Sequence, residues 1–170
     1  SVTEFGVRHI VSSWAFVKGL VDNNLIEKKL TSVDIIECDM TNVSDICKKL
    51  NFEFKFIQEN SILINIEQTD LLFIDTWHVY GHLKRELNKH HSKVNKYIIM
   101  HDTTVDKIYG ETIRCKLNAE KQSLMSGYSL KEILCGLQLA IDEFLNENKD
   151  WKLIKEFTNN NGLTILGRIE

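Results

Sequence analysis

The 170-residue chain is long enough to bury one core, and its 43% hydrophobic and 26% charged residues are typical of a globular protein. No apolar run approaches the ~18 residues of a membrane span, and no secretory signal is visible, so we expect a cytoplasmic protein. A net charge of −3 with scattered Lys and Arg argues against nucleic acid as the main partner.

Short apolar segments alternate with helical patterns through the first half of the chain. The run 71–74 is apolar throughout, which is typical of a strand buried on both faces of a parallel sheet. The predicted elements are strands at 2–5, 30–36, 52–57 and 71–74, and helices that start at Ser12 or Ser13 and at Ser44.

The second half continues this alternation and ends differently. Helices are predicted at 79–91 and 133–145, and strands at 97–100, 151–157 and 163–169. Asn161-Gly162 supplies the positive φ angles of a hairpin turn, so the last two strands should be antiparallel. We therefore expect an α/β fold of the Rossmann-like type. Its sheet should have seven mostly parallel strands and end in an antiparallel β-hairpin.

Polar residues follow successive strands at one predicted edge of the sheet. In open α/β sheets, ligands bind beyond the carboxyl ends of the strands. An acid and an imidazole three residues apart, with a second His-Asp pair opposite, are costly to bury without a role. These residues are Glu4, Gly6, Arg8 and Ser13, then Asp34, then Asn60 and Ser61, then Asp75, Trp77 and His78, and finally His101 and Asp102.

The stretch 104–130 shows little periodicity and is long for a connection in a compact domain. Such a segment is usually a lid or a binding segment, so we expect it to choose the substrate through Tyr109, Glu111 and Arg114. The other histidines of the helix 79–91, His82, His90 and His91, are expected at the surface or an interface.

Four segments carry a resemblance to a known family. They are Glu4-Phe5-Gly6-Val7-Arg8 with Ser12-Ser13, Phe73-Ile74-Asp75 with His78 and Tyr80, Ile98-Ile99-Met100-His101-Asp102-Thr103, and residues 157–164. Together they resemble the class I S-adenosylmethionine-dependent methyltransferases, in the branch of sugar O-methyltransferases and cephalosporin-hydroxylase-like proteins. The resemblance extends over nearly the whole chain.

The resemblance implies roles for individual residues. S-adenosylmethionine would contact Glu4, Gly6, Arg8, Ser13, Asp75 and Trp77, with its ribose on Asp34 and its adenine near Asn60 and Ser61. His78 would be the catalytic base beside Asp75. A Mg²⁺ or Mn²⁺ ion would bind Asp75, Asp102 and His101.

The resemblance also implies an activity and partners. The chain would transfer a methyl group to a hydroxyl of a small-molecule or glycan acceptor, with a (deoxy)sugar as the expected substrate. We expect residues 1–170 to be a single domain excised from a longer protein, a setting compatible with fused glycosyltransferase domains in glycan biosynthesis. A homo-oligomer is equally compatible.

Three departures from the family pattern keep alternatives open. Ile10 stands where a second glycine is usual, Trp77 stands at the place of a frequent acid, and His101 replaces an acid. Fewer carboxylates would hold Mg²⁺ more weakly, so metal dependence stays open. The alternatives are an inactive cofactor-binding scaffold in a glycan-building protein and a nicotinamide-dependent oxidoreductase, whose Gly-x-Gly-x-x-Gly is missing here. An iron-dependent hydroxylase is less favoured.

Overall fold

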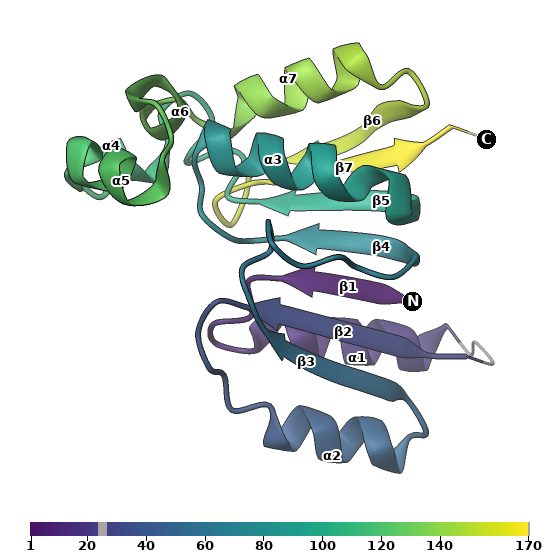
Figure 1. The fold of residues 1–170 in the computed structure, drawn as a ribbon. Helices are drawn as coiled ribbons and strands as arrows, with labels where there is room; N and C mark the ends of the chain where they lie inside the picture. The colour runs from purple at the N-terminus through teal and green to yellow at the C-terminus, as the bar shows by residue number, and fades with distance from the viewer. Residues whose placement is uncertain (24–26, 170) are drawn as a thin grey trace.

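A computed structural model describes residues 1–23 and 27–169 (Figure 1). One seven-stranded sheet has the order β3-β2-β1-β4-β5-β7-β6. The strands are β1 (Val2–Phe5), β2 (Lys29–Asp34), β3 (Glu53–Gln58), β4 (Thr69–Ile74), β5 (Val94–His101), β6 (Trp151–Phe157) and β7 (Leu163–Arg168). The α-helices are α1 (Val11–Asp22), α2 (Thr41–Lys49), α3 (Tyr80–His90), α4 (Glu111–Arg114), α5 (Ala119–Ser126), α6 (Leu130–Leu134) and α7 (Leu137–Glu147), and η1 (His91–Lys93) is a 3₁₀ turn.

The predicted sheet is confirmed. β1 to β5 pair in parallel, whereas β7 is antiparallel to both β5 and β6. The turn between β6 and β7 contains Asn160, Asn161 and Gly162 with φ angles of 51°, 69° and 100°. These are the left-handed conformations that the Asn-Gly pair was expected to supply.

Helices cover the two faces of the sheet unequally. In Figure 1, α3 and α7 lie over the half of the sheet that contains β5, while α1 lies behind β2 and α2 lies below β3. The buried side chains accordingly form two clusters. Phe5, Leu72, Ile98 and Phe144 belong to the cluster on the α3 and α7 side, and Leu30 belongs to the one on the α1 and α2 side.

Several element boundaries differ from the prediction. α1 begins at Val11, and its N-cap is Ile10 in the left-handed conformation, with a φ of 65°. Ser12 and Ser13 therefore lie inside the first turn, where their hydroxyls contact another group. β2 ends at Asp34, so the predicted last two residues of that strand are outside the sheet.

The predicted helix 133–145 is in fact two helices. α6 ends at Leu134 and α7 begins at Leu137, with Gly136 between them. A Cβ on Gly136 would lie 2.3 Å from the carbonyl oxygen of Asp106, so only glycine allows this close approach. The break thereby fixes the loop that carries Asp106 against the start of α7.

The surface positions expected for His82 and His90 are wrong. His82 is 8% exposed and His90 is 1% exposed. Both are buried against the connection 59–68, where Ser61 contacts each of the two imidazoles. His90 Nε2 lies 2.7 Å from the carbonyl oxygen of Ser61, and the His90 ring packs edge-on against Phe5.

Burial gives His90 an expected effect on stability. Desolvation holds its pKa below the ordinary value of 6.5, so the folded chain binds fewer protons at this site than the unfolded chain. The stabilisation is present above that value and is lost as the pH falls below it, by up to ~1.4 kcal/mol per pH unit. His90→Gln keeps a donor and should flatten this dependence in denaturant unfolding between pH 7 and 5. The exposed control His9→Gln should follow the wild type, and equal curves for both variants would contradict the prediction.

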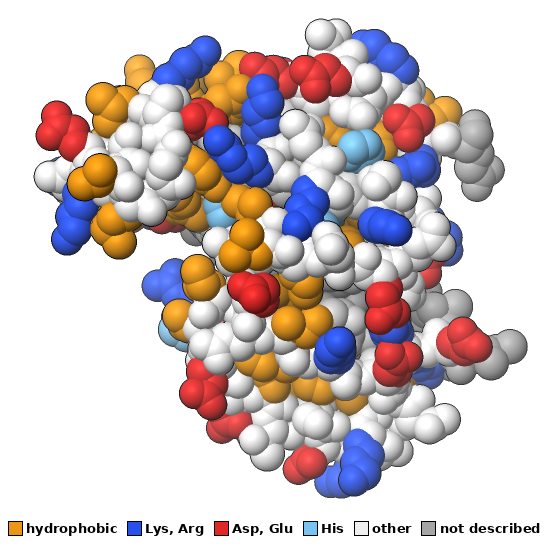
Figure 2. Space-filling view, viewed as in Figure 1, with side chains coloured by type: hydrophobic (Ala, Val, Ile, Leu, Met, Phe, Trp, Pro, Cys, Tyr) orange, Lys and Arg blue, Asp and Glu red, His pale blue; other side chains and the backbone are white. Residues whose placement is uncertain are grey.

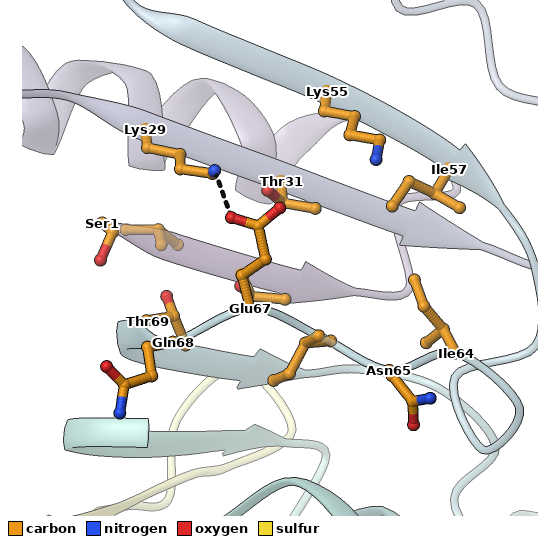
Figure 3. Close-up of a pocket in the computed structure, with 13 residues that line it drawn as sticks. Ser1, Lys29, Thr31, Lys55, Ile57, Ile64, Asn65, Glu67, Gln68 and Thr69 are labelled. Atoms are coloured by element: carbon orange, nitrogen blue, oxygen red, sulfur yellow. Dashed lines mark hydrogen bonds and ion pairs between the residues drawn. The ribbon is translucent and has the colours of Figure 1, made fainter. Parts of the chain in front are cut away.

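The groove in Figure 3 lies away from the predicted ligand edge. It runs from the amino ends of β1, β2 and β4 along the sheet face that the connection 59–68 crosses. Lys29 spans part of it and bonds to Glu67 at 2.8 Å and to Glu53 at 2.7 Å. The Lys29 charge is thus already paired within the chain. In the stretches 1–23 and 27–169, no helix has the length and apolar character needed to cross a membrane.

Candidate active site

The loop between β1 and α1 is held tightly against the end of β4. Gly6 has a φ of 84°, and a Cβ built on it would lie 1.9 Å from the carbonyl oxygen of Asp75. The Gly6 amide donates to the Val33 carbonyl at 2.9 Å, and the Asp75 amide donates to the Phe5 carbonyl at 2.9 Å. Glycine is therefore required here both by the backbone conformation and by the contact.

Glu4 accepts hydrogen bonds from residues in the first turn of α1, directly after the same loop. Its side chain is fully buried, and it accepts hydrogen bonds from the hydroxyls of Ser12, Ser13 and Ser32 at 2.5, 2.7 and 2.8 Å. Burial raises the pKa of Glu4, and these three donors oppose the rise. Glu4 and Ser13 thus fix the start of α1, while their direct contact with a cofactor stays a prediction.

Asp34 joins the ends of β1 and β2. Its Oδ2 accepts from the amides of Val7 and Arg8 at 2.8 and 3.0 Å, and its Oδ1 accepts from the Ile36 amide at 3.0 Å. Arg8 is exposed, with a φ of 43°. The carboxylate lies at the strand end where a ribose was expected, and its bonds shape the loop that would receive a cofactor.

Two acids and two imidazoles form a closed ring at the ends of β4 and β5. Asp75 Oδ1 lies 3.0 Å from His78 Nε2 and 3.4 Å from His101 Nδ1. Asp102 Oδ2 lies 3.1 Å from His78 Nδ1, and Asp102 Oδ1 lies 3.0 Å from His101 Nδ1. The structure therefore brings together all four residues that the two strand-end pairs supplied. Asp102 has a φ of 58°, a strained conformation that turns its side chain into the ring.

Two further carboxylates lie against the same histidine. Asp106 Oδ2 is 3.4 Å and Glu111 Oε2 is 3.2 Å from His78 Nδ1. Asp106 is fully buried and accepts two hydrogen bonds from Arg114, at 2.7 and 2.8 Å. Sequence reasoning missed Asp106 and gave Glu111 and Arg114 only a substrate role. The four-residue spacing from Asp102 was the available signal, because the Asp106 amide donates to the Asp102 carbonyl.

These neighbours change the proton affinity of the imidazoles. Burial alone would lower the pKa of His78, but Asp106, Asp75 and Glu111 raise it to about 11. Asp102 and Asp75 raise the pKa of His101 to about 10. Burial works to raise the pKa of Asp75, and the two imidazoles nevertheless hold it well below its ordinary value. In the chain by itself, both histidines are positively charged at neutral pH.

A second polar network lies behind the ring, between α3 and the connection 59–68. Glu86 is fully buried and accepts from the hydroxyls of Ser61 at 2.6 Å and Thr76 at 2.9 Å. The His82 Nε2 atom lies 3.3 Å from Glu86. The Ser61 hydroxyl is thus engaged inside the protein. Asn60 caps its own turn by accepting from the Ile62 amide at 2.9 Å. Adenine contacts by Asn60 and Ser61 stay predictions.

The predicted substrate segment is a small helical lobe. In Figure 1, α4, α5 and α6 project beyond the carboxyl ends of the strands. Trp77 stacks on Tyr128 of this lobe with ring centres 5.6 Å apart, and Arg85 lies over the same ring. Figure 2 shows hydrophobic side chains on the lobe. The exposed large hydrophobic residues on it and just before it are Ile108, Tyr109, Ile113, Leu117, Leu124, Met125 and Leu130.

Several solved structures have a fold similar to that of this chain. The N-methyltransferase NodS from Bradyrhizobium japonicum WM9 has a TM-score of 0.55 and 11% identity over 99% of this chain and 85% of its own. The SAH-bound magnesium protoporphyrin IX methyltransferase ChlM from Synechocystis PCC 6803 has a TM-score of 0.58 and 9% identity, covering 98% of this chain and 73% of its own. The SAH-bound methyltransferase PaMTH1 from Podospora anserina has a TM-score of 0.56 and 13% identity, covering 99% and 71%.

The fold is that of the class I methyltransferases. The antiparallel β7 inside an otherwise parallel sheet agrees with this assignment. No protein-family model and no curated protein matches the chain, and the likeness at these low identities concerns the fold alone. The chain also spans only 42% of the length of another similar structure, OxaC.

Proposed function

We propose that this chain, which has the methyltransferase fold, is an S-adenosylmethionine-dependent O-methyltransferase. The observation that carries the proposal is the ring of Asp75, His78, Asp102 and His101 at the carboxyl edge of the sheet, beside the Gly6 loop. Ligands of open α/β sheets bind at this edge. The SAH bound to ChlM and PaMTH1 supports the choice of cofactor.

The β1–α1 loop and the end of β2 would hold the cofactor. The Gly6 backbone packs against Asp75 at this edge, and the exposed Arg8 and the Asp34 carboxylate flank the loop. Trp77, on the loop after β4, has an aromatic face beside the same edge. The cofactor itself supplies a methyl group already activated on sulfur, so the protein's task is to place the acceptor oxygen and remove its proton.

Asp75 would take up that proton, with His78 as its hydrogen-bonded partner. Their Nε2 and Oδ1 atoms are 3.0 Å apart, and Asp75 is the more accessible partner, with 31% of its side chain exposed against 13% for His78. The hydroxyl proton would pass to the Asp75 carboxylate, which the Nε2–H of His78 holds in place. The pair refines the expectation of His78 acting alone, because the imidazole is nearly enclosed.

A divalent cation, implied by the resemblance, fits the chemistry of these residues. His78 Nδ1 and Asp102 Oδ1 are buried and have no hydrogen-bond partner among the described residues. His78 is shared by the two groups of side chains that could hold such an ion. When bound, the cation would supply positive charge that favours the deprotonated form of a nearby hydroxyl.

The acceptor would lie between the ring and the lobe. We propose a sugar or glycan hydroxyl, with Tyr109 at the lobe surface available for stacking on a sugar face and Glu111 and Arg114 close to the ring. Tyr109 is 64% exposed. Arg114 is paired with Asp106, so it would act on the acceptor mainly by orienting that carboxylate. The aliphatic side chains beside Tyr109 would suit an acceptor that also carries an apolar group.

Calorimetric titration with S-adenosylmethionine and with SAH tests the proposal, with NAD as the control ligand. We expect micromolar binding of both sulfur ligands and none of NAD. Turnover on sugar acceptors then separates an enzyme from an inactive cofactor-binding scaffold, which would bind without turnover. A folded sample that binds neither sulfur ligand would refute the proposed cofactor.

A further inference from the structure

Three carboxylate oxygens gather around one nitrogen of His78. Its Nδ1 lies 3.1 Å from Asp102 Oδ2, 3.2 Å from Glu111 Oε2 and 3.4 Å from Asp106 Oδ2. None of these contacts has the geometry of a hydrogen bond, and Nδ1 is fully buried without a partner among the described residues. Among these atoms, Nδ1 and the oxygens of Asp106 and Glu111 all lie within 4.8 Å of one another, close enough to share one ion.

This group also carries uncompensated negative charge. Asp106 is neutralised by Arg114, and Asp102 faces the second imidazole. Glu111 has no ion-pair partner other than His78 in the described part of the chain. Asp102 and Asp106 are 8% and 0% exposed, so water screens them poorly. Buried carboxylates in excess over their partners are unfavourable, and a cation would offset that penalty.

The opposite side of His78 is better balanced. There Asp75 faces two imidazoles, since its Oδ1 lies within 3.4 Å of both His78 and His101. A cation on that side would have to displace positive groups that already satisfy Asp75. The ligand set expected from the resemblance, Asp75, Asp102 and His101, is thus less suited to an ion than the set on the Nδ1 side.

We propose that Asp106, Glu111 and Nδ1 of His78, with Asp102 beside Nδ1, form a binding site for one hard divalent cation, Mg²⁺ or Mn²⁺. Neighbouring ligands of an octahedral ion at ~2.1 Å are roughly 3 Å apart, which the distances around Nδ1 resemble. Carboxylate oxygens with one imidazole suit these metals, and the charged His78 would release its Nδ1 proton to solvent on binding the ion. Arg114 acts as a positioning residue, because its two hydrogen bonds fix the orientation of Asp106.

The site links two parts of the fold. Asp102 follows β5 and His78 follows β4, whereas Glu111 begins α4 in the lobe. The cation would therefore hold the lobe against the sheet edge, beside the proposed His78–Asp75 pair. The inference deepens the proposed function, but cation binding can be measured without any cofactor or acceptor.

Titration of the full chain with Mn²⁺ tests the site, followed by calorimetry and by loss of the free Mn²⁺ signal in electron paramagnetic resonance. We expect one ion per chain. Removing one ligand in Glu111→Gln or Asp106→Asn should weaken binding by about 10–100-fold, as loss of outer-shell partners alone can do. The surface substitution Glu147→Gln removes an equal charge and should leave the affinity unchanged.

The remaining outcomes decide against the site. Absence of binding at millimolar Mn²⁺ in a folded wild-type sample overturns it. Equal loss of affinity in His101→Gln and no loss in Glu111→Gln places the ion on the Asp75 side and also overturns it. If Asp106→Asn does not fold, Glu111→Gln decides, because that side chain is partly exposed. SAH binding with no cation binding refutes this site alone, and the reverse result refutes the proposed cofactor alone.

Discussion

His78→Gln is expected to lower methyl transfer by about 10²–10⁴-fold, the range in which a positioned acid or base contributes. The imidazole contacts Asp75 through one nitrogen and three further carboxylates through the other. Glutamine can keep a donor to Asp75 but has neither the positive charge of the imidazole nor a nitrogen in place of Nδ1. The affinity for SAH should not change, because none of the proposed cofactor contacts involves His78.

The matched control is His91→Gln. His91 follows α3, and its Nδ1 lies 2.9 Å from the carbonyl oxygen of Leu87, remote from the ring. It should keep wild-type turnover. Turnover that survives in His78→Gln would remove His78 from the mechanism, while a parallel loss of SAH binding would show that the substitution acts on the fold of the site instead.

Gly6→Ala is expected to destabilise the protein by roughly 3–5 kcal/mol, from left-handed backbone strain together with overpacking. The new Cβ would lie 1.9 Å from the Asp75 carbonyl oxygen, so β1 and β4 would have to separate at the site. Their separation also moves Asp75, and SAH binding should be lost along with stability. Urea unfolding and SAH titration measure the two effects.

Gly127→Ala isolates the contribution of the backbone. Gly127 ends α5 with a φ of 75°, yet no atom lies within 4 Å of its added Cβ. It should therefore cost only about 1–2 kcal/mol and leave SAH binding intact. Equal destabilisation by the two substitutions would mean that the contact with Asp75 relaxes easily and that Gly6 is needed for its conformation alone.

The sheet was predictable because its signals are local. The apolar run that ends before Asp75 predicts β4, and the Asn161-Gly162 turn predicts the hairpin of β6 and β7. Both features appear in the structure. The start of α1 was not predictable in the same way. Hydroxyls of Ser12 and Ser13 suggested an N-cap, but buried Glu4 takes them as donors, and Ile10 precedes the helix in a conformation that β-branched residues avoid.

The ring was predictable only in part. Asp75, His78, His101 and Asp102 follow two strands that turn out to be neighbours, so their meeting follows from topology. Asp106 and Glu111 depend on a turn and a short helix inside a segment without periodicity. Asp106 is held by the packing of Gly136 against its backbone, 30 positions away, and Glu111 by the hydrogen bond from its amide to the His78 carbonyl. Such tertiary contacts leave no local pattern in a single sequence.

The position of the lobe bears on how such a protein can diversify. Residues 111–134 form α4, α5 and α6 as an excursion between β5 and α7, and the seven strands pair without them. Substitutions at outward positions such as Leu124 and Met125, far from the sheet, should act independently of substitutions in the core. Selection could then retune the acceptor by altering the lobe while the inherited scaffold keeps its stability. Glu111 is the exception, because it lies in the lobe and also contacts His78 at the proposed active site.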